Sequence, residues 1–165
     1  MSDSASAQTP SPVRLEAGEL APDFTLVDTH GTPVTLSALR GTPVVVVFIP
    51  FAFSGTCRGE LCEIRDNIAA FDSAGARVLV VSCDSTFTLR AWKEQEGYGF
   101  DLLSDFWPHG DVARAYEVFD EKAGRPLRGS FLVDADGVLR WSVVNPAGQA
   151  RDLAAYRAAI ADLAA

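Results

Sequence analysis

The feature that most constrains the fold of this sequence is the run Val44-Val-Val-Val-Phe-Ile49, six consecutive apolar residues that are mostly β-branched or aromatic. A strand with one face in water alternates apolar and polar residues, whereas an uninterrupted run indicates a strand covered on both faces, as in the centre of an α/β sheet. A second such run is Val78-Leu-Val-Val81. Between them, from Cys57 to a stop at Gly75, apolar residues recur at steps of three and four, which predicts a helix.

The remaining segments continue this alternation of strands and helices. Turn signals at Asp28–Gly31 and Asp134–Gly137, each between apolar segments, predict two hairpins. We expect further helices over residues 86–96, 111–118 and 152–163, and one short strand at residues 102–103. Strands that alternate with helices and end in a hairpin plus a helix predict an α/β fold, a three-layer α/β/α sandwich with a mixed central sheet.

Length and composition indicate one globular domain. The chain has 165 residues, of which 48% are apolar and 22% charged. Residues 1–14 are rich in Ser, Ala and Pro and lack an apolar signal-peptide region, so we expect a disordered tail before a domain over residues 15–165. No stretch reaches the ~18–20 apolar residues of a membrane span, and a net charge of −8 disfavours binding to nucleic acid or an anionic membrane.

Three cysteines, Cys57, Cys62 and Cys83, are too few and too odd in number for a disulfide scaffold. Without an export signal the expected location is cytoplasmic, where a cysteine matters for its reactivity or as a small buried hydrophobe. Cys57 stands where a loop leaving the sheet enters a helix, and the unpartnered N–H groups there favour a thiolate. On position alone, Cys57 could equally be a small residue that fills the helix start.

The residues around Cys57 carry a resemblance to a known family. Pro50-x-x-x-Ser54-x-x-Cys57 resembles the peroxiredoxin active-site motif Pro-x-x-x-Thr/Ser-x-x-Cys, with the usual threonine replaced by serine. Further segments that match the family in order and spacing are Ala21–Phe24, Leu102–Asp105 and Arg128–Asp134. Within the family, the segments most similar to the alkyl hydroperoxide reductase E branch are Pro50–Leu61 and Ser104–Gly110.

This resemblance implies a thioredoxin-like fold and a thiol-dependent peroxidase that reduces hydrogen peroxide and organic hydroperoxides. It implies that Cys57 is the peroxidatic cysteine, whose thiolate attacks a peroxide oxygen and becomes a sulfenic acid. Arg128 would then supply a cation to the thiolate and polarise the O–O bond, with Glu60 holding Arg128 by a bidentate pair. The Ser54 hydroxyl would bridge peroxide and thiolate, and Pro50 would shield the sulfur from water.

Cys62, five residues after Cys57, resembles the resolving cysteine of the peroxiredoxin Q group, whereas the alkyl hydroperoxide reductase E branch is typically one-cysteine. The alternative is a helix cysteine that faces the core. Five residues along an ideal helix separate two Cα atoms by roughly 8.7 Å, and disulfides rarely form beyond ~7 Å. A Cys57–Cys62 disulfide therefore requires the first helical turn to unwind. For Cys83, at the end of a strand, we expect a buried, unreactive thiol.

No Gly-rich phosphate loop or dinucleotide fingerprint is present, and His30 and His109 have no partners at metal-ligand spacing, so we expect no cofactor and no metal. The resemblance implies a peroxide substrate, an external thiol reductant of the thioredoxin or mycoredoxin/mycothiol type, and a homodimer. Apolar walls near the active-site loop are expected from Phe51, Phe53, Phe106 and Trp107. The alternative function is a thioredoxin-like redox-sensing or thiol–disulfide exchange module without peroxidase turnover, although the exchange chemistry usually requires a Cys-x-x-Cys pair, which is absent.

Overall fold

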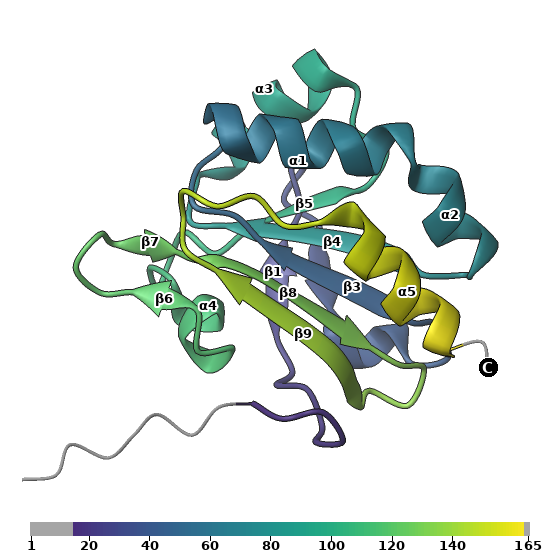
Figure 1. Cartoon of the computed structure of the whole chain (residues 1–165). Helices are drawn as coiled ribbons and strands as arrows, with labels where there is room; N and C mark the ends of the chain where they lie inside the picture. Colours follow the sequence, from purple (N-terminus) through teal and green to yellow (C-terminus); the bar gives the residue numbers. More distant parts are fainter. Residues whose placement is uncertain (1–14, 164–165) are drawn as a thin grey trace, which may run out of the picture.

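A seven-stranded mixed sheet forms the centre of the computed structural model, which describes residues 15–163 (Figure 1). The strand order is β2-β1-β5-β4-β3-β8-β9, and the strands are β1 (Thr25–Val27), β2 (Pro33–Thr35), β3 (Val44–Phe48), β4 (Arg77–Ser82), β5 (Asp101–Ser104), β8 (Arg128–Val133) and β9 (Leu139–Asn145). The central strands β3, β4 and β5 are parallel, and the other pairs are antiparallel. The tail expected over residues 1–14 lies outside the described residues.

Helices cover both faces of this sheet. They are α1 (Gly55–Asp66), α2 (Ile68–Ser73), α3 (Thr86–Glu96), α4 (Asp111–Ala115) and α5 (Leu153–Leu163), with a 3-10 turn at Leu36–Leu39. Figure 1 shows α1, α2, α3 and α5 on one face and the short α4 on the other. The predicted three layers are therefore confirmed, although the second helical layer is thin. None of the helices within residues 15–163 is long and apolar enough to cross a lipid bilayer.

The side-chain alternation along β3 divides the apolar core into two parts. Val45 and Val47 face the core beneath α1, α3 and α5, whereas Val44 and Val46 face the core beside α4. All four valines are buried, as the uninterrupted apolar run of β3 predicts for a strand covered on both faces. Both predicted hairpins are present, as β1–β2 and β8–β9.

Three details of the helices differ from the sequence prediction. The helix with Cys57 begins at Gly55, because Ser54 takes an extended conformation and serves as its N-cap residue. It ends at Asp66, since Asn67 leaves helical geometry and its side-chain amide donates to the carbonyl of Glu63 (2.8 Å), so that α2 is a separate helix. The helix predicted over 111–118 stops at Ala115, two residues before Glu117, whose φ of 59° no right-handed helix contains.

The parallel strands place three loops at one edge of the sheet. The loop after β3 carries Pro50 and Ser54 into α1, the loop after β4 carries Cys83, and the loop after β5 begins with Asp105. The carboxyl ends of parallel strands are where ligand sites of open α/β sheets are formed. The residues with predicted chemistry therefore gather where the topology favours a site.

Candidate active site

Cys57 lies in the first turn of α1 and is fully buried, with 0% of its surface exposed. A backbone hydrogen bond runs from the Arg58 N–H to the Ser54 carbonyl oxygen (2.9 Å). The N–H groups of the first residues of a helix have no carbonyl oxygen within the helix to which they can donate. These groups and the helix dipole place partial positive charge at the turn of α1 that contains Cys57.

The loop before α1 is fixed to the neighbouring strand and contains an unpartnered hydroxyl. The Asp84 carboxylate accepts hydrogen bonds from the Ala52 N–H and the Ser82 hydroxyl (both 2.8 Å), and Pro50 is buried at the start of this loop. The hydroxyl oxygen of Ser54 is buried and has no hydrogen-bond partner among residues 15–163. A buried polar atom without a partner costs about 1–3 kcal/mol, so a ligand that bonded to it would recover that cost.

Glu60, one turn after Cys57, is buried in an ion-pair cluster with two arginines. Arg128 Nη1 donates to Glu60 Oε1 (2.5 Å), so the predicted Glu60–Arg128 pair is present. It is not bidentate, because the bidentate partner is Arg151, whose Nη2 and Nε donate to the two carboxylate oxygens (both 2.9 Å). The expectation of a bidentate Glu60–Arg128 pair was wrong, since Arg151 already occupies both oxygens.

Arg151 is the residue at this site that sequence reasoning missed. Its Nη1 donates to the carbonyl oxygens of Phe48 (2.7 Å) and Gly129 (2.9 Å), so it joins the ends of β3 and β8 to α1. Arg151 lies in the loop between β9 and α5, next to exposed residues, and no local pattern marks it as buried. Its burial arises from tertiary structure, because this loop returns across the end of the sheet to Glu60.

The cluster of Glu60, Arg128 and Arg151 has an excess of positive charge. Burial by itself raises the pKa of the Glu60 carboxyl, but hydrogen bonds and charge from Arg151, with a further contribution from Arg128, lower it overall. A carboxylate between two guanidinium groups leaves a formal charge of about +1 in a region where all three side chains are buried. A cluster with this excess positive charge, one turn from Cys57, attracts negative charge that develops on a neighbouring side chain or on a bound ligand.

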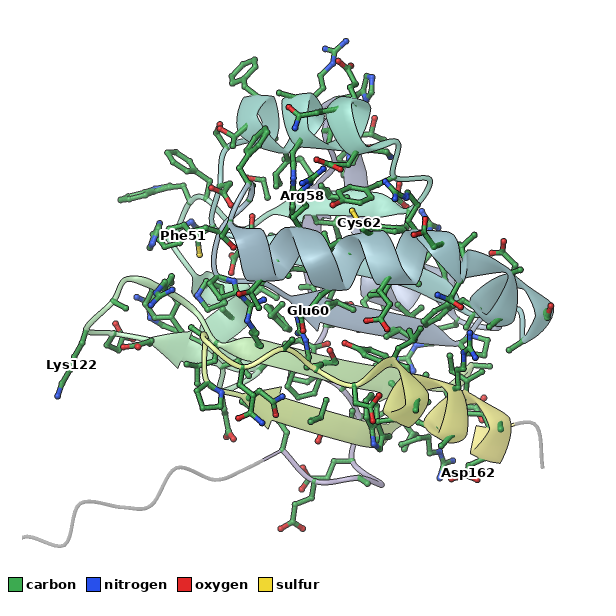
Figure 2. All side chains as sticks on the ribbon, turned by 45° about the horizontal axis from the view of Figure 1, so that its top comes forward. Phe51, Arg58, Glu60, Cys62, Lys122 and Asp162 are labelled. Carbon is green, nitrogen blue, oxygen red and sulfur yellow. The ribbon has the colours of Figure 1, made fainter. Side chains whose placement is uncertain are left out.

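The other two cysteines have different surroundings. Figure 2 shows Cys62 and Arg58 on the side of α1 that faces α3, and Glu60 on the opposite side. All three cysteines are free thiols. Cys83 is buried, and burial, followed by the charges of Asp105 and Asp84, raises its pKa to about 12. At neutral pH Cys83 is therefore a thiol of low reactivity, as expected.

A buried cysteine in the first helical turn after the central strand of a mixed sheet fits the class of thiol-dependent peroxidases, and the relatives and solved structures that the chain matches belong to that class. The sequence matches the AhpC/TSA family over residues 17–142. The chain belongs to this family, and its peroxiredoxin relatives agree with the resemblance found in the sequence motifs.

Individual relatives and solved structures place the chain more closely. It is 43% identical over 152 residues to alkyl hydroperoxide reductase E of Mycobacterium tuberculosis, covering 92% of this chain and 99% of that protein. It is 35% identical over 142 residues to peroxiredoxin 2 of Thermoplasma acidophilum, covering 82% and 70%. The crystal structure of the peroxidoxin BcpB of M. tuberculosis matches with a TM-score of 0.78 and 28% identity over 92% of this chain and 97% of that chain. AhpC of Enterococcus faecalis matches with a TM-score of 0.81 and 26% identity over 90% and 92%.

Proposed function

We propose that Cys57 is the nucleophile of this thiol-dependent peroxidase and that the substrates are hydrogen peroxide and organic hydroperoxides. The observation that carries this proposal is the Ser54 hydroxyl, which is buried at the N-cap of the helix that holds Cys57 in its first turn and has no hydrogen-bond partner within the described residues 15–163. A peroxide oxygen is the kind of ligand that this hydroxyl can bind, since it accepts and donates hydrogen bonds.

In the proposed reaction, the Cys57 thiolate attacks one peroxide oxygen, an S–O bond forms and the O–O bond breaks. The departing oxygen takes up a proton and leaves as water or an alcohol, and Cys57 is left as a sulfenic acid. Arg128, held by Glu60, offsets the negative charge on sulfur and on the departing oxygen. Ser54 orients the peroxide, and Pro50, which has no N–H, keeps water from the sulfur.

We further propose that Cys62 resolves the sulfenic acid by forming a disulfide with Cys57. Because α1 is continuous from Gly55 to Asp66 with both thiols free, the described state is the reduced one, and the first turn unwinds before the disulfide forms. Gly55 and Gly59 weaken this turn, since glycine is a poor helix former. An external thiol reductant of the thioredoxin or mycoredoxin/mycothiol type then reduces the disulfide.

The proposed assembly is a homodimer formed at the edge of the sheet that carries the site. Four aromatic side chains in the loops after β3 and β5 are exposed, and they are Phe51 (47%), Phe53 (46%), Phe106 (54%) and Trp107 (83%). These loops leave the same edge of the sheet, because β3 and β5 are both parallel to β4. Exposed apolar residues gathered in this way are typical of protein–protein contact surfaces.

The test of the proposed nucleophile is peroxide consumption by Cys57→Ser in the presence of a dithiol reductant. Serine is nearly isosteric with cysteine, so we expect an intact fold and less than a tenth of the wild-type rate. The matched control is Cys83→Ser, because Cys83 is also a buried cysteine at this edge of the sheet, and it should retain the wild-type rate. Turnover of a tenth or more in Cys57→Ser would contradict the proposal.

A further inference from the structure

A group of polar side chains that the peroxide reaction does not use surrounds Cys62. This group, the Cys62 cluster, contains Arg58, Cys62, Arg65, Glu96 and Tyr98. The Cys62 sulfur donates to Glu96 Oε2 (3.6 Å) and lies 3.8 Å from the Tyr98 hydroxyl oxygen. Figure 2 shows Arg58 and Cys62 together between α1 and α3, away from Glu60. The second thiol thus has a carboxylate and a hydroxyl within hydrogen-bonding reach.

Glu96 is the centre of the Cys62 cluster. It is the last residue of α3, and only 8% of its surface is exposed. Arg58 Nε donates to Glu96 Oε1 (2.7 Å), and Arg65 Nη1 donates to the Glu96 carbonyl oxygen (2.5 Å) and lies 3.9 Å from Oε2. The hydrogen bond from Arg58 is the main cause that lowers the pKa of the Glu96 carboxyl below its usual value. In the reduced protein Glu96 is therefore a carboxylate, paired with Arg58.

The two arginines of the cluster occupy different parts of α1. Arg58 follows Cys57 directly, in the turn that must unwind before the two cysteines can join. Arg65 belongs to the last turn, and between the arginines Leu61 and Ile64 hold the helix in the core. Unwinding of the first turn therefore carries Arg58 away from Glu96 but leaves Arg65 in place. Loss of Arg58 removes the strongest of the contacts that make Glu96 a weak base and leaves the weaker hydrogen bond from the Gln95 amide (3.2 Å), at the time when Cys62 has to lose its proton.

We propose that Glu96 is the catalytic base of the resolving step, which accepts the proton of Cys62, and that the Arg58–Glu96 ion pair holds the first turn of α1 closed until this step. This inference rests on the proposed roles of Cys57 and Cys62. It adds Glu96, which none of the sequence motifs contains, to the residues that take part in the reaction.

In the resolving step the Cys62 S–H proton passes to Glu96, and the Cys62 sulfur attacks the sulfur of the Cys57 sulfenic acid. The S–S bond forms as the S–O bond of Cys57 breaks, and the departing hydroxide takes up one proton and leaves as water. The Cys62 sulfur is oxidised and the Cys57 sulfur is reduced, so no further oxidant or reductant is needed. Burial raises the pKa of Tyr98, so its hydroxyl stays protonated and can donate to the Cys62 sulfur as negative charge develops there.

The test separates a base from a simple clamp by comparing Glu96→Gln with Arg58→Ala. Both changes weaken the same ion pair, so a clamp would give faster disulfide formation in both variants. If Glu96 is the base, the two substitutions change the rate of disulfide formation in opposite directions. We expect Glu96→Gln to form the disulfide at least tenfold more slowly than wild type, and Arg58→Ala to form it faster. The matched control is Glu94→Gln, an exposed glutamate on α3 outside the cluster, which should match wild type.

The measurement is a single turnover with one equivalent of peroxide, followed by tryptophan fluorescence and by acid quench and mass spectrometry of the Cys57–Cys62 peptide. Trp92 is suited to this, because its ring lies 5.9 Å from that of Phe53 in the active-site loop and 5.3 Å from that of Tyr98. Circular dichroism checks that each variant is folded. Should Glu96→Gln not fold, Glu96→Asp takes its place, since the shorter side chain withdraws the carboxylate from Cys62 and should also slow the step.

The outcomes distinguish this inference from the proposed function. If wild type forms no Cys57–Cys62 disulfide, the resolving role of Cys62 and the role of Glu96 are both overturned. If wild type forms the disulfide but the Glu96 variant is as fast or faster, only the role of Glu96 is overturned. A slower Glu96 variant beside a faster Arg58→Ala supports the inference.

Discussion

At the scale of single residues, the site depends on a buried carboxylate that joins two buried arginines. Glu60 binds Arg151 through both oxygens and Arg128 through one, so the three side chains fix each other at the start of α1. An ion pair of this kind contributes little to stability compared with apolar packing, but removal of one partner leaves the other charge buried and unpaired. A change at one of these residues can therefore alter both the stability of the fold and the chemistry of the site, and separate measurements distinguish the two effects.

Arg128→Ala should slow the reaction of Cys57 with peroxide about 100-fold. The physical reason is that, in the proposed reaction, Arg128 supplies a fixed positive charge where negative charge develops, and the loss of one such donor typically costs 10²–10³ in rate. Stopped-flow tryptophan fluorescence of reduced protein mixed with excess peroxide gives the rate constant. Arg90→Ala, an exposed arginine on α3, is the control. A rate for Arg128→Ala within threefold of wild type would show that Arg128 plays no part in the step.

Glu60→Gln should destabilise the fold at neutral pH by about 3–5 kcal/mol, because it leaves two buried arginines without a counter-charge. The pKa of Glu60 is lowered by folding, so its stabilising effect is complete above its ordinary value of 4.5 and is lost as the pH falls through the lower folded value. The stability difference between wild type and variant should therefore shrink below about pH 4.5. Urea unfolding over a pH series measures it, and a difference that is constant with pH would argue against this ion-pair account.

At the scale of elements, the proposed reaction requires α1 to be both a rigid frame for Cys57 and a helix that opens at its first turn. Gly59 has no side chain to pack, and a Cβ added there would meet nothing within 4 Å. Gly59→Ala should therefore stabilise the turn by roughly 1 kcal/mol. Since the turn must unwind for the disulfide, we expect Cys57–Cys62 disulfide formation to slow about fivefold, whereas the earlier peroxide step in the same stopped-flow trace stays unchanged. Disulfide formation that is as fast as in wild type would contradict local unwinding.

The elements also show how far the sequence could predict this fold. β3, β4 and α5 carry long apolar patterns, and the structure confirms them close to their predicted positions. The hairpin of β6 (Phe119–Asp120) and β7 (Arg125–Pro126) was not predicted, because strands of two residues are too short to show a periodicity. The family motifs predicted most residues of the candidate site. A motif, however, includes only residues that are close together in the chain or that are already known to belong to the motif. Arg151 and Glu96 reach their partners through tertiary contacts alone, so no local pattern could reveal them.

At the scale of the whole molecule, the exposed aromatic side chains at the edge of the sheet predict the assembly. Trp107→Ser should shift the protein from dimer to monomer at micromolar concentration without loss of fold, because Trp107 is 83% exposed in the single chain. Leu20→Ser is the matched control, since Leu20 is also exposed (66%) but pairs with Val138 next to the β8–β9 turn, at the opposite end of the sheet. Sedimentation velocity measures both. A Trp107 variant that stays dimeric, or a wild-type monomer, would rule out this interface.

In the proposed reaction, peroxide oxidises Cys57 first, ahead of the other two thiols. The direct measurement uses Cys62→Ser, which cannot form the Cys57–Cys62 disulfide, treated with one equivalent of hydrogen peroxide in the presence of dimedone, which traps sulfenic acids. Peptide mass spectrometry then locates the adduct. If Cys57 is the nucleophile, a single dimedone adduct is expected on Cys57, with Cys83 still open to alkylation after unfolding. An adduct on Cys83, or peroxide consumption that leaves Cys57 unmodified, would contradict it.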